Sequence, residues 1–291
     1  MRRFEISLRR RTNLTVLDDD TLVGRAVRYM QFLRDQLPTV DLVQTVLMDE
    51  TAVCFEDARQ TTLDFTGARH VVVRSTGFAS MRITVVLAVS ATGRKLPPLL
   101  VWKGKAAPTF EKRPGPLYVA HQPHAWVDSE LLKKWIDLAF PLVVHRECKC
   151  LVWDSMRAHI SKAVKAKCST RKIVMCVVPG GLTPYLQAGD IWIYKSFKDL
   201  LYLEINAWKE SDKVEYTRFG NRRMPSVNTV CEWVLRAWRD TDETAITRSI
   251  EAAGFANTPS EFIAKHDVYG AKFQKNWSEE SKENEGEDLL D

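Results

Sequence analysis

The chain has 291 residues with 45% apolar and 27% charged side chains, which is typical of a soluble globular protein of one large domain or two small ones. No stretch approaches the roughly 18 consecutive apolar residues of a membrane helix, so a membrane-spanning protein is excluded. The net charge of +5 and the isoelectric point of about 8.8 favour an anionic partner.

Charge is concentrated at the two ends of the chain. Arginines crowd the first eleven residues, and Arg9, Arg10 and Arg11 either contact phosphates or form a solvated arm. The same stretch lacks the apolar segment of a signal peptide, so we expect an intracellular protein. The tail SEESKENEGEDLLD is acidic and lacks aromatic residues, and we expect it to be disordered. The six cysteines show no metal-binding spacing, and Cys148 and Cys150 are expected to fill one face of a strand.

A helix followed by a series of strands is predicted in the first half. Three aspartates at 18–20 start a helix that Pro38 closes, and we interpret it as a connecting helix. Short apolar strands follow at residues 42–49, 70–75, 82–90 and 96–102. Pro97 and Pro98 indicate that the last of these is an edge strand or an irregular one.

Strands and helices alternate in the second half. We expect a helix from Asp128, strands at 148–154 and 172–179, and a helix near 159–167 between them. Three more helices are predicted, one after Gly181, one capped by Ser226 and one starting at Asp242. This order predicts an α/β fold, in which helices pack on a mixed sheet.

Three aspartates could carry chemistry. Asp49 and Asp154 end apolar strands, and Asp190 opens a later helix. Acids at strand ends sit on a rigid frame beside a crevice. Such hard oxygen ligands bind the Mg²⁺ or Mn²⁺ that phosphodiester cleavage needs. Each acid also has a simpler explanation, because Asp49 and Asp154 could close turns and Asp190 could cap its helix.

Three blocks of sequence indicate a family. In chain order, VLMDETAV, LVWDSMRAHI and PGGLTPYLQAGDIWIYKSFKDLL resemble the signature blocks of the pogo/Tigger/jerky group of DDE transposases, to which centromere protein B belongs. The resemblance covers nearly the whole chain except the acidic tail. It implies an RNase H-like fold, which is a mixed sheet flanked by helices, with extra C-terminal helices. The implied domains are a basic arm and connecting helix at 1–38, a catalytic domain at 39–255 and a tail at 256–291.

The resemblance also implies a site that cleaves DNA. Asp49, Asp154 and Asp190 match the three catalytic, metal-binding acids of the family, with Mg²⁺ or Mn²⁺ as cofactor. The last two acids are 190 − 154 = 36 positions apart, similar to the spacing in this superfamily. His159 matches a histidine that follows the second acid, and it either supports the site or packs locally. Glu50 is at best a supporting residue.

Other residues near the acids have alternative explanations. Lys195 and Lys198 follow Asp190 by one and two helical turns, and they either contact DNA or form a solvated helix face. Trp153 and Trp192 adjoin the acids, and we expect both to be core residues.

The sequence departs from the family pattern in two places. Leu47 stands where the family has Asn, and Ala188-Gly189 replaces Pro-Leu just before Asp190. Gly189 is expected to loosen the backbone at the third acid. A drift of about 1 Å there could lower catalysis on the order of 100-fold. The chain also begins where the family's helix-turn-helix region would be ending, which suggests a truncated or decaying transposon copy.

Two functions are therefore open. The first is a metal-dependent DNA endonuclease in which water attacks first and a DNA 3′-hydroxyl then attacks a target phosphate. The second is a catalytically inactive, domesticated DNA-binding or scaffolding protein on the same fold. Both have DNA as partner, and the resemblance implies a nuclear location. A homodimer is left open.

Overall fold

The computed structural model describes residues 17–56, 77–78, 81–105, 110–141, 148–255 and 271–278. The expected strand at 70–75, the three N-terminal arginines and the end of the acidic tail lie outside the described residues. Among the helices that are described, none is long and apolar enough to span a membrane.

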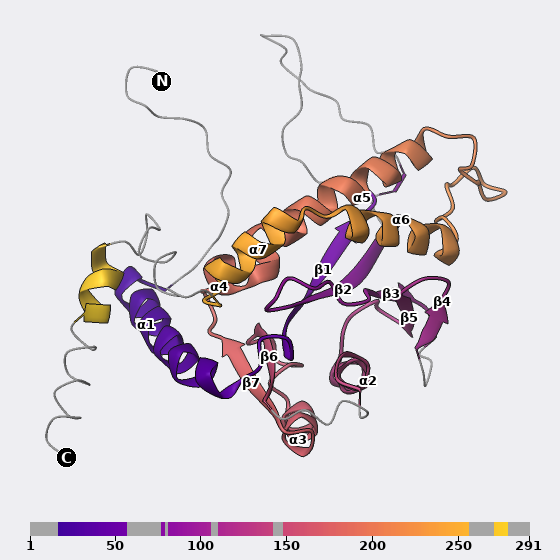
Figure 1. The fold of residues 1–291 in the computed structure, drawn as a ribbon. Helices are drawn as coiled ribbons and strands as arrows, with labels where there is room; N and C mark the ends of the chain where they lie inside the picture. The colour runs from indigo at the N-terminus through magenta and orange to yellow at the C-terminus, as the bar shows by residue number, and fades with distance from the viewer. Residues whose placement is uncertain are drawn as a thin grey trace, which may run out of the picture.

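Seven strands form one mixed sheet in the order β4-β5-β3-β2-β1-β6-β7 (Figure 1). They are β1 (Thr45–Cys54), β2 (Arg82–Ser90), β3 (Leu99–Lys103), β4 (Glu111–Arg113), β5 (Leu117–Gln122), β6 (Lys149–Asp154) and β7 (Ile173–Val178). β1, β6 and β7 are parallel, β2 is antiparallel to both of its neighbours, and β5 is parallel to β3. Five strands therefore run in one direction, and their carboxyl ends lie at the same edge of the sheet.

Helices cover both faces of the sheet. The labelled helices are α1 (Asp19–Gln36), η2 (Leu37–Thr39), α2 (Ser129–Ala139), α3 (Lys162–Thr170), α4 (Thr183–Leu186), η3 (Gly189–Ile193), α5 (Tyr194–Lys209), α6 (Val227–Asp240) and α7 (Glu243–Ala252). The apolar sides of α1, α5, α6 and α7 share a core with one face of the sheet. α2 and α3 pack on the opposite face and form a second core. This arrangement explains why the central strands are apolar on both sides.

The helices begin where short polar side chains can cap them. Asp18, Asp128, Ser226 and Asp242 each accept a hydrogen bond from a backbone N–H group two or three residues onward. These hydrogen bonds satisfy N–H groups that the first turn leaves free. All four had been predicted as helix starts, and the prediction is confirmed.

The first helix is part of the main core. α1 buries seven residues, and Arg25 on the same helix donates a hydrogen bond to the carbonyl oxygen of Gly180 over 2.8 Å. Residues 271–278 are helical and lie against α1, where Phe273 is fully buried and the Arg34 guanidinium lies 5.3 Å from the Trp277 ring. α1 therefore packs on the domain in addition to leading into it.

Several local expectations are wrong. Asp49 was expected to end its strand, but it lies in the middle of β1, because pairing with β2 continues as far as Cys54. β3 is an internal strand, because Pro97 and Pro98 lie just before it and leave its N–H groups free to pair with β2 and β5. Cys148 is exposed and precedes β6 with φ +69°, so only Cys150 fills a strand face. The sequence analysis also missed β4 and β5, which extend the sheet beyond β3.

The turn after α7 gives a test of packing. Gly254 has φ +98°, and an added Cβ would lie 3.0 Å from Leu33 Cδ1 and 3.1 Å from Met30 Cε. We expect Gly254→Ala to lower the free energy of unfolding by about 2–3 kcal/mol, because backbone strain and overpacking add. Gly93→Ala is the control, since φ is +87° there but nothing lies within 4 Å. Gly93→Ala should lower the free energy of unfolding by about 1 kcal/mol, measured by urea titration. Equal losses of stability in the two variants would contradict a contribution of overpacking at Gly254.

Candidate active site

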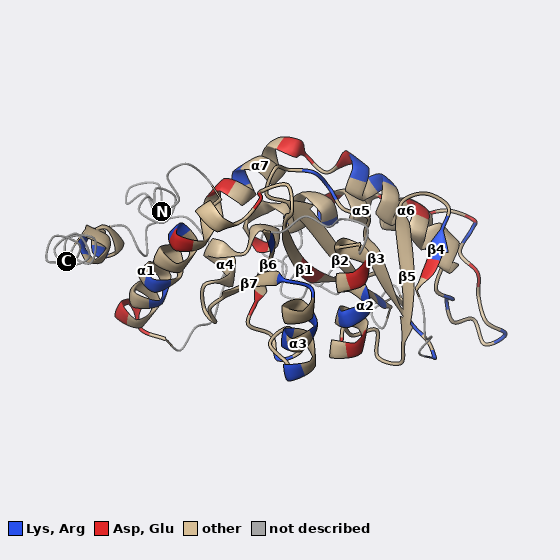
Figure 2. Ribbon diagram, turned by 60° about the horizontal axis from the view of Figure 1, so that its bottom comes forward, with Lys and Arg blue, Asp and Glu red and all other residues tan. Residues whose placement is uncertain are grey.

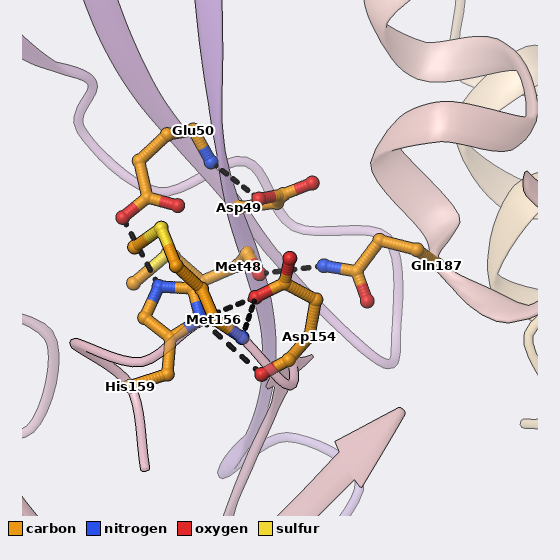
Figure 3. Close-up of polar contacts among 7 residues, drawn as sticks. All are labelled: Met48, Asp49, Glu50, Asp154, Met156, His159 and Gln187. Carbon is orange, nitrogen blue, oxygen red and sulfur yellow. Dashed lines mark hydrogen bonds and ion pairs between the residues drawn. The ribbon is translucent and has the colours of Figure 1, made fainter. Parts of the chain in front are cut away.

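Asp49 and Asp154 lie side by side because of the strand register. Leu47 on β1 pairs with Val152 on the parallel strand β6. Asp49 lies two residues after Leu47, and Asp154 lies two residues after Val152. Side chains two positions apart point to the same face of a sheet. Leu47 and Val152 belong to the core under α5 and α6, so both acids point to that face. Figure 3 shows one carboxylate oxygen of Asp154 directed towards Asp49, whose own carboxylate is bound by the Glu50 N–H group.

Asp190 reaches the same place from the helical layer. It lies in η3, one turn of π-helix that leads directly into α5, and its N–H group donates to the carbonyl oxygen of Gln187 over 3.0 Å. The Gln187 side chain in turn donates to the carbonyl oxygen of Met48 over 3.0 Å (Figure 3). This buried contact fixes the segment before Asp190 to β1, next to Asp49. The structure thus brings the three predicted acids into one region.

The acids repel one another electrostatically. Asp49 is only 9% exposed, and its Oδ1 accepts a hydrogen bond of 2.7 Å from the backbone N–H of Glu50. Burial raises the pKa of Asp49 well above its usual range, and the charges of Glu50, Asp190 and Asp154 raise it further. Burial and the charge of Asp154 likewise raise the pKa of Asp190, although Lys198 opposes them. A cation near these groups would be strongly favoured.

His159 links the second acid to Glu50. Its ring is completely buried, with Nδ1 2.6 Å from Asp154 Oδ1 and Nε2 3.1 Å from Glu50 Oε1 (Figure 3). Burial alone would lower the pKa of His159, but the two hydrogen-bonded carboxylates raise it to about 10. Burial opposes ionisation of Asp154, yet hydrogen bonds from His159 and from the Met156 N–H lower the pKa of Asp154. His159 is therefore an imidazolium that holds both carboxylates in place.

The indole of Trp153 supports this histidine. The two rings stack with centroids 4.5 Å apart and an interplanar angle of 2°, and Trp153 is fully buried. Trp153 is thus a core residue, as predicted. Trp192 is not, because 40% of its surface is exposed on η3. Trp192 lies two positions after Asp190, which is about half a helical turn. Its side chain therefore points away from the acids, on the solvent side of the turn.

The two lysines after Asp190 have different environments. Lys195 is exposed and pairs with Asp199 over 2.8 Å along the helix, as expected of a solvated face. Lys198 is half-buried beside the acids. The pKa of Lys198 is lowered, because burial outweighs the negative charges of Asp190 and Asp49, which oppose the shift. As a basic side chain beside the acids, Lys198 can supply a second positive charge at the site.

Gly189 does not loosen the third-acid segment, contrary to expectation. A Cβ atom added there would lie 2.6 Å from Tyr194 Oη, so the Tyr194 ring fills the space beside the glycine. Tyr194 is buried, and among the described residues its hydroxyl has no hydrogen-bond partner. The sequence analysis missed Tyr194. The signal that could have revealed it is the unusual glycine at position 189, five residues before a tyrosine in the same helical segment.

The donor set suits a divalent metal ion chemically. Among the described residues, the Oδ2 atoms of Asp49 and Asp154 accept no hydrogen bond, so each acid keeps one oxygen free. Hard carboxylate oxygens of this kind suit Mg²⁺ or Mn²⁺. However, the described residues contain no group of three acidic, histidine or cysteine side chains close enough to hold an ion together. The three acids therefore fit the ion by the chemistry of their oxygens, whereas their arrangement in the described residues is not that of a closed metal site.

The glycine–tyrosine contact generates a prediction. Gly189→Ala should lower the free energy of unfolding by about 1–3 kcal/mol, because the methyl group overlaps the Tyr194 ring. Gly189→Ala combined with Tyr194→Val should be less destabilised than the sum of the single changes, measured by urea titration. Gly180→Ala is the matched control, since its added Cβ meets only Ser155 Oγ at 3.6 Å. If the losses of stability in the two single variants add up in the double variant, the predicted overlap between the added methyl group and the Tyr194 ring is refuted.

Comparison with known proteins gives the family. The DDE superfamily endonuclease family matches residues 80–249, which is more than half of the chain. The pogo transposable element with KRAB domain of Mus musculus is 28% identical over 253 residues, covering 85% of this chain and 42% of the relative. The human protein of the same name is 26% identical over 256 residues, covering 86% of this chain and 42% of the relative. The chain thus spans less than half the length of these relatives.

Solved structures give the fold. The Mos1 transposase paired-end complex with left transposon end superposes with a TM-score of 0.53 at 14% identity, covering 95% of this chain and 68% of that chain. A pre-cleavage Mos1 transpososome gives a TM-score of 0.51 at 13% identity with the same coverage. The expected α/β, RNase H-like fold is confirmed. The chain belongs to the DDE superfamily endonucleases, in their pogo-type transposase group.

Proposed function

We propose that this domain cleaves DNA strands and transfers their ends with the help of Mg²⁺ or Mn²⁺ bound by Asp49, Asp154 and Asp190. The observation that carries the proposal is that three acids from β1, β6 and η3 lie in one region, near enough for burial and their mutual repulsion to raise the pKa of Asp49. Carboxylates gathered in this way destabilise a fold unless a cation joins them.

The surrounding residues have separate tasks. His159 holds Asp154 and Glu50, so that the free Oδ2 of Asp154 points towards Asp49 (Figure 3). The Gln187 contact with Met48 holds Asp190 near the sheet. Lys198 lies beside the acids and would bind a non-bridging oxygen of the DNA phosphate. A bound divalent ion would supply Lewis acidity for attack by water and then by a DNA 3′-hydroxyl.

The comparisons support the metal and the partner by analogy. Mos1 paired-end complexes with Mg and with Mn superpose on this chain with TM-scores of 0.51 and 0.50. At 13–14% identity they establish only the fold. Together with the pogo relatives, they support DNA as the partner and a divalent ion as the cofactor, as proposals for this chain. A nuclear location is proposed on the family resemblance of the sequence blocks alone. Arg9, Arg10 and Arg11 would add phosphate contacts, and a homodimer would pair two DNA ends.

A second function has one observation in its favour. In the described residues the three acids are not close enough to form a ready metal site, and His159 already occupies Oδ1 of Asp154. A domesticated protein that binds DNA without cutting it would tolerate such a site. It would bind DNA without metal and show no cleavage with any ion.

Substitution of the second acid distinguishes the two functions. We expect Asp154→Asn to lower Mn²⁺-dependent nicking of a labelled DNA duplex by at least about 100-fold, because one charged ligand is lost. Asp199→Asn is the control, since Asp199 is an exposed acid that pairs with Lys195 along α5. Mn²⁺ binding, measured by calorimetry without DNA, should weaken in Asp154→Asn and remain unchanged in the control. Equal nicking by Asp154→Asn and wild type would rule out the proposed active site.

A further inference from the structure

A short hairpin connects α5 to α6. Tyr216 and Arg222 form an antiparallel bridge, and Thr217 N–H donates to the Asn221 carbonyl oxygen over 2.7 Å. The Thr217 hydroxyl oxygen accepts a further hydrogen bond of 3.1 Å from the Asn221 N–H, and Gly220 closes the turn with φ +77°. These contacts give residues 215–223 a defined conformation.

The base of the hairpin is anchored in the core, whereas its tip is free. Val214 and Pro225 are buried, and the Arg222 guanidinium lies 5.2 Å from the centroid of the Phe78 ring. Figure 1 shows the orange segment between α5 and α6 extending beyond the ends of both helices, away from the sheet. In Figure 2 basic residues are visible on this extension. The fold therefore presents the tip to solvent.

The tip combines exposed aromatic and cationic side chains. Phe219 is 74% exposed and Tyr216 is 55% exposed. The Arg218 guanidinium lies 4.5 Å from the centroid of the Phe219 ring. The hairpin, residues 215–223, contains three arginines and one glutamate, so its net charge is 3 − 1 = +2. The core does not need an exposed phenylalanine here, because Val214 and Pro225 already anchor the loop.

We propose that this hairpin is a DNA-contacting finger that acts outside the active site. Its arginines would bind backbone phosphates, and Phe219 would insert against the sugars and bases of the minor groove. The identity of the partner rests on the proposed function. Charge complementarity favours DNA over a protein surface, since a hairpin with a net charge of +2 and a single acid suits a polyanion.

The position of the hairpin relative to the acids fits one DNA duplex. Asp190 lies just before α5 and the hairpin just after it, and the helix has 16 residues. At 1.5 Å per residue it spans about 24 Å, which corresponds to about seven base pairs at 3.4 Å each. A duplex whose phosphate lies at the acids would therefore reach the finger within one helical turn.

The test is DNA affinity in the absence of metal. The affinity of the full chain for a fluorescein-labelled 30-base-pair duplex is measured by anisotropy in EDTA at several salt concentrations. Arg218→Ala should weaken binding several-fold and lower the slope of log affinity against log salt by about 0.9, since one phosphate contact is lost. Phe219→Ala should weaken binding at least about 5-fold with an unchanged slope. Lys165→Ala on α3 and Leu203→Ala on α5, where Leu203 is 67% exposed, should bind like wild type.

The possible outcomes separate this proposal from the proposed function. If the wild type binds DNA and an Arg218→Ala/Phe219→Ala variant binds equally well, the finger is refuted while the active-site proposal stands. If that variant keeps its DNA affinity but changes the molar mass in light scattering, the tip contacts a second copy of the chain, which also refutes the finger. If the wild type does not bind DNA at all, both proposals fail. Thermal melting should be unchanged by the tip substitutions, because the side chains are exposed.

Discussion

The accumulation of negative charge around the middle of β1 is the constraint on which the rest of the structure depends. Asp49 is nearly buried beside Glu50, and Asp154 and Asp190 both act on it electrostatically. Two nearby positive charges compensate this group of acids. His159 binds Asp154 and Glu50 directly, and Lys198 approaches from α5. Because each compensating residue comes from a different segment, the loop after β6 and the helix α5 must both be placed accurately before the sheet can tolerate its own acids.

The sheet itself brings two of the acids together. Parallel pairing of β1 and β6 aligns Leu47 with Val152, and the two-residue period then puts Asp49 and Asp154 on the same face. Glu50 follows Asp49 by one residue and therefore points to the other face, where it meets His159 around the end of β6. The buried Trp153 lies beneath the histidine ring, so the second core of the protein supports the imidazolium. The site thus depends on both hydrophobic layers.

The sequence predicted the parts of the structure that repeat regularly. Apolar strand ends, polar caps and family blocks located the central strands, the main helices and the three acids. It could not predict β4, because the three residues Glu111, Lys112 and Arg113 carry no apolar alternation and gain their place only from pairing with a neighbour. The strand β5 does have a short apolar pattern, and it was overlooked. The role of Gly189 was also misjudged. Local propensity indicates a flexible glycine, but the Tyr194 ring, five residues later, turns with the π-helix and fills that space.

Contacts between α5 and α6 connect the region of the acids to the basic hairpin at the other end of α5. Arg236 on α6 forms two hydrogen bonds with Glu204 on α5, at 2.9 and 2.7 Å, and the two helices share the main core. The planar guanidinium binds the carboxylate with two hydrogen bonds, which favours one orientation of the two packed helices. Lys198 lies near the start of α5 and the basic hairpin lies at its end, so this pair of helices holds positive charge at a fixed spacing. A regular polyanion favours such spacing, whereas a partner with irregular charge gains little from it.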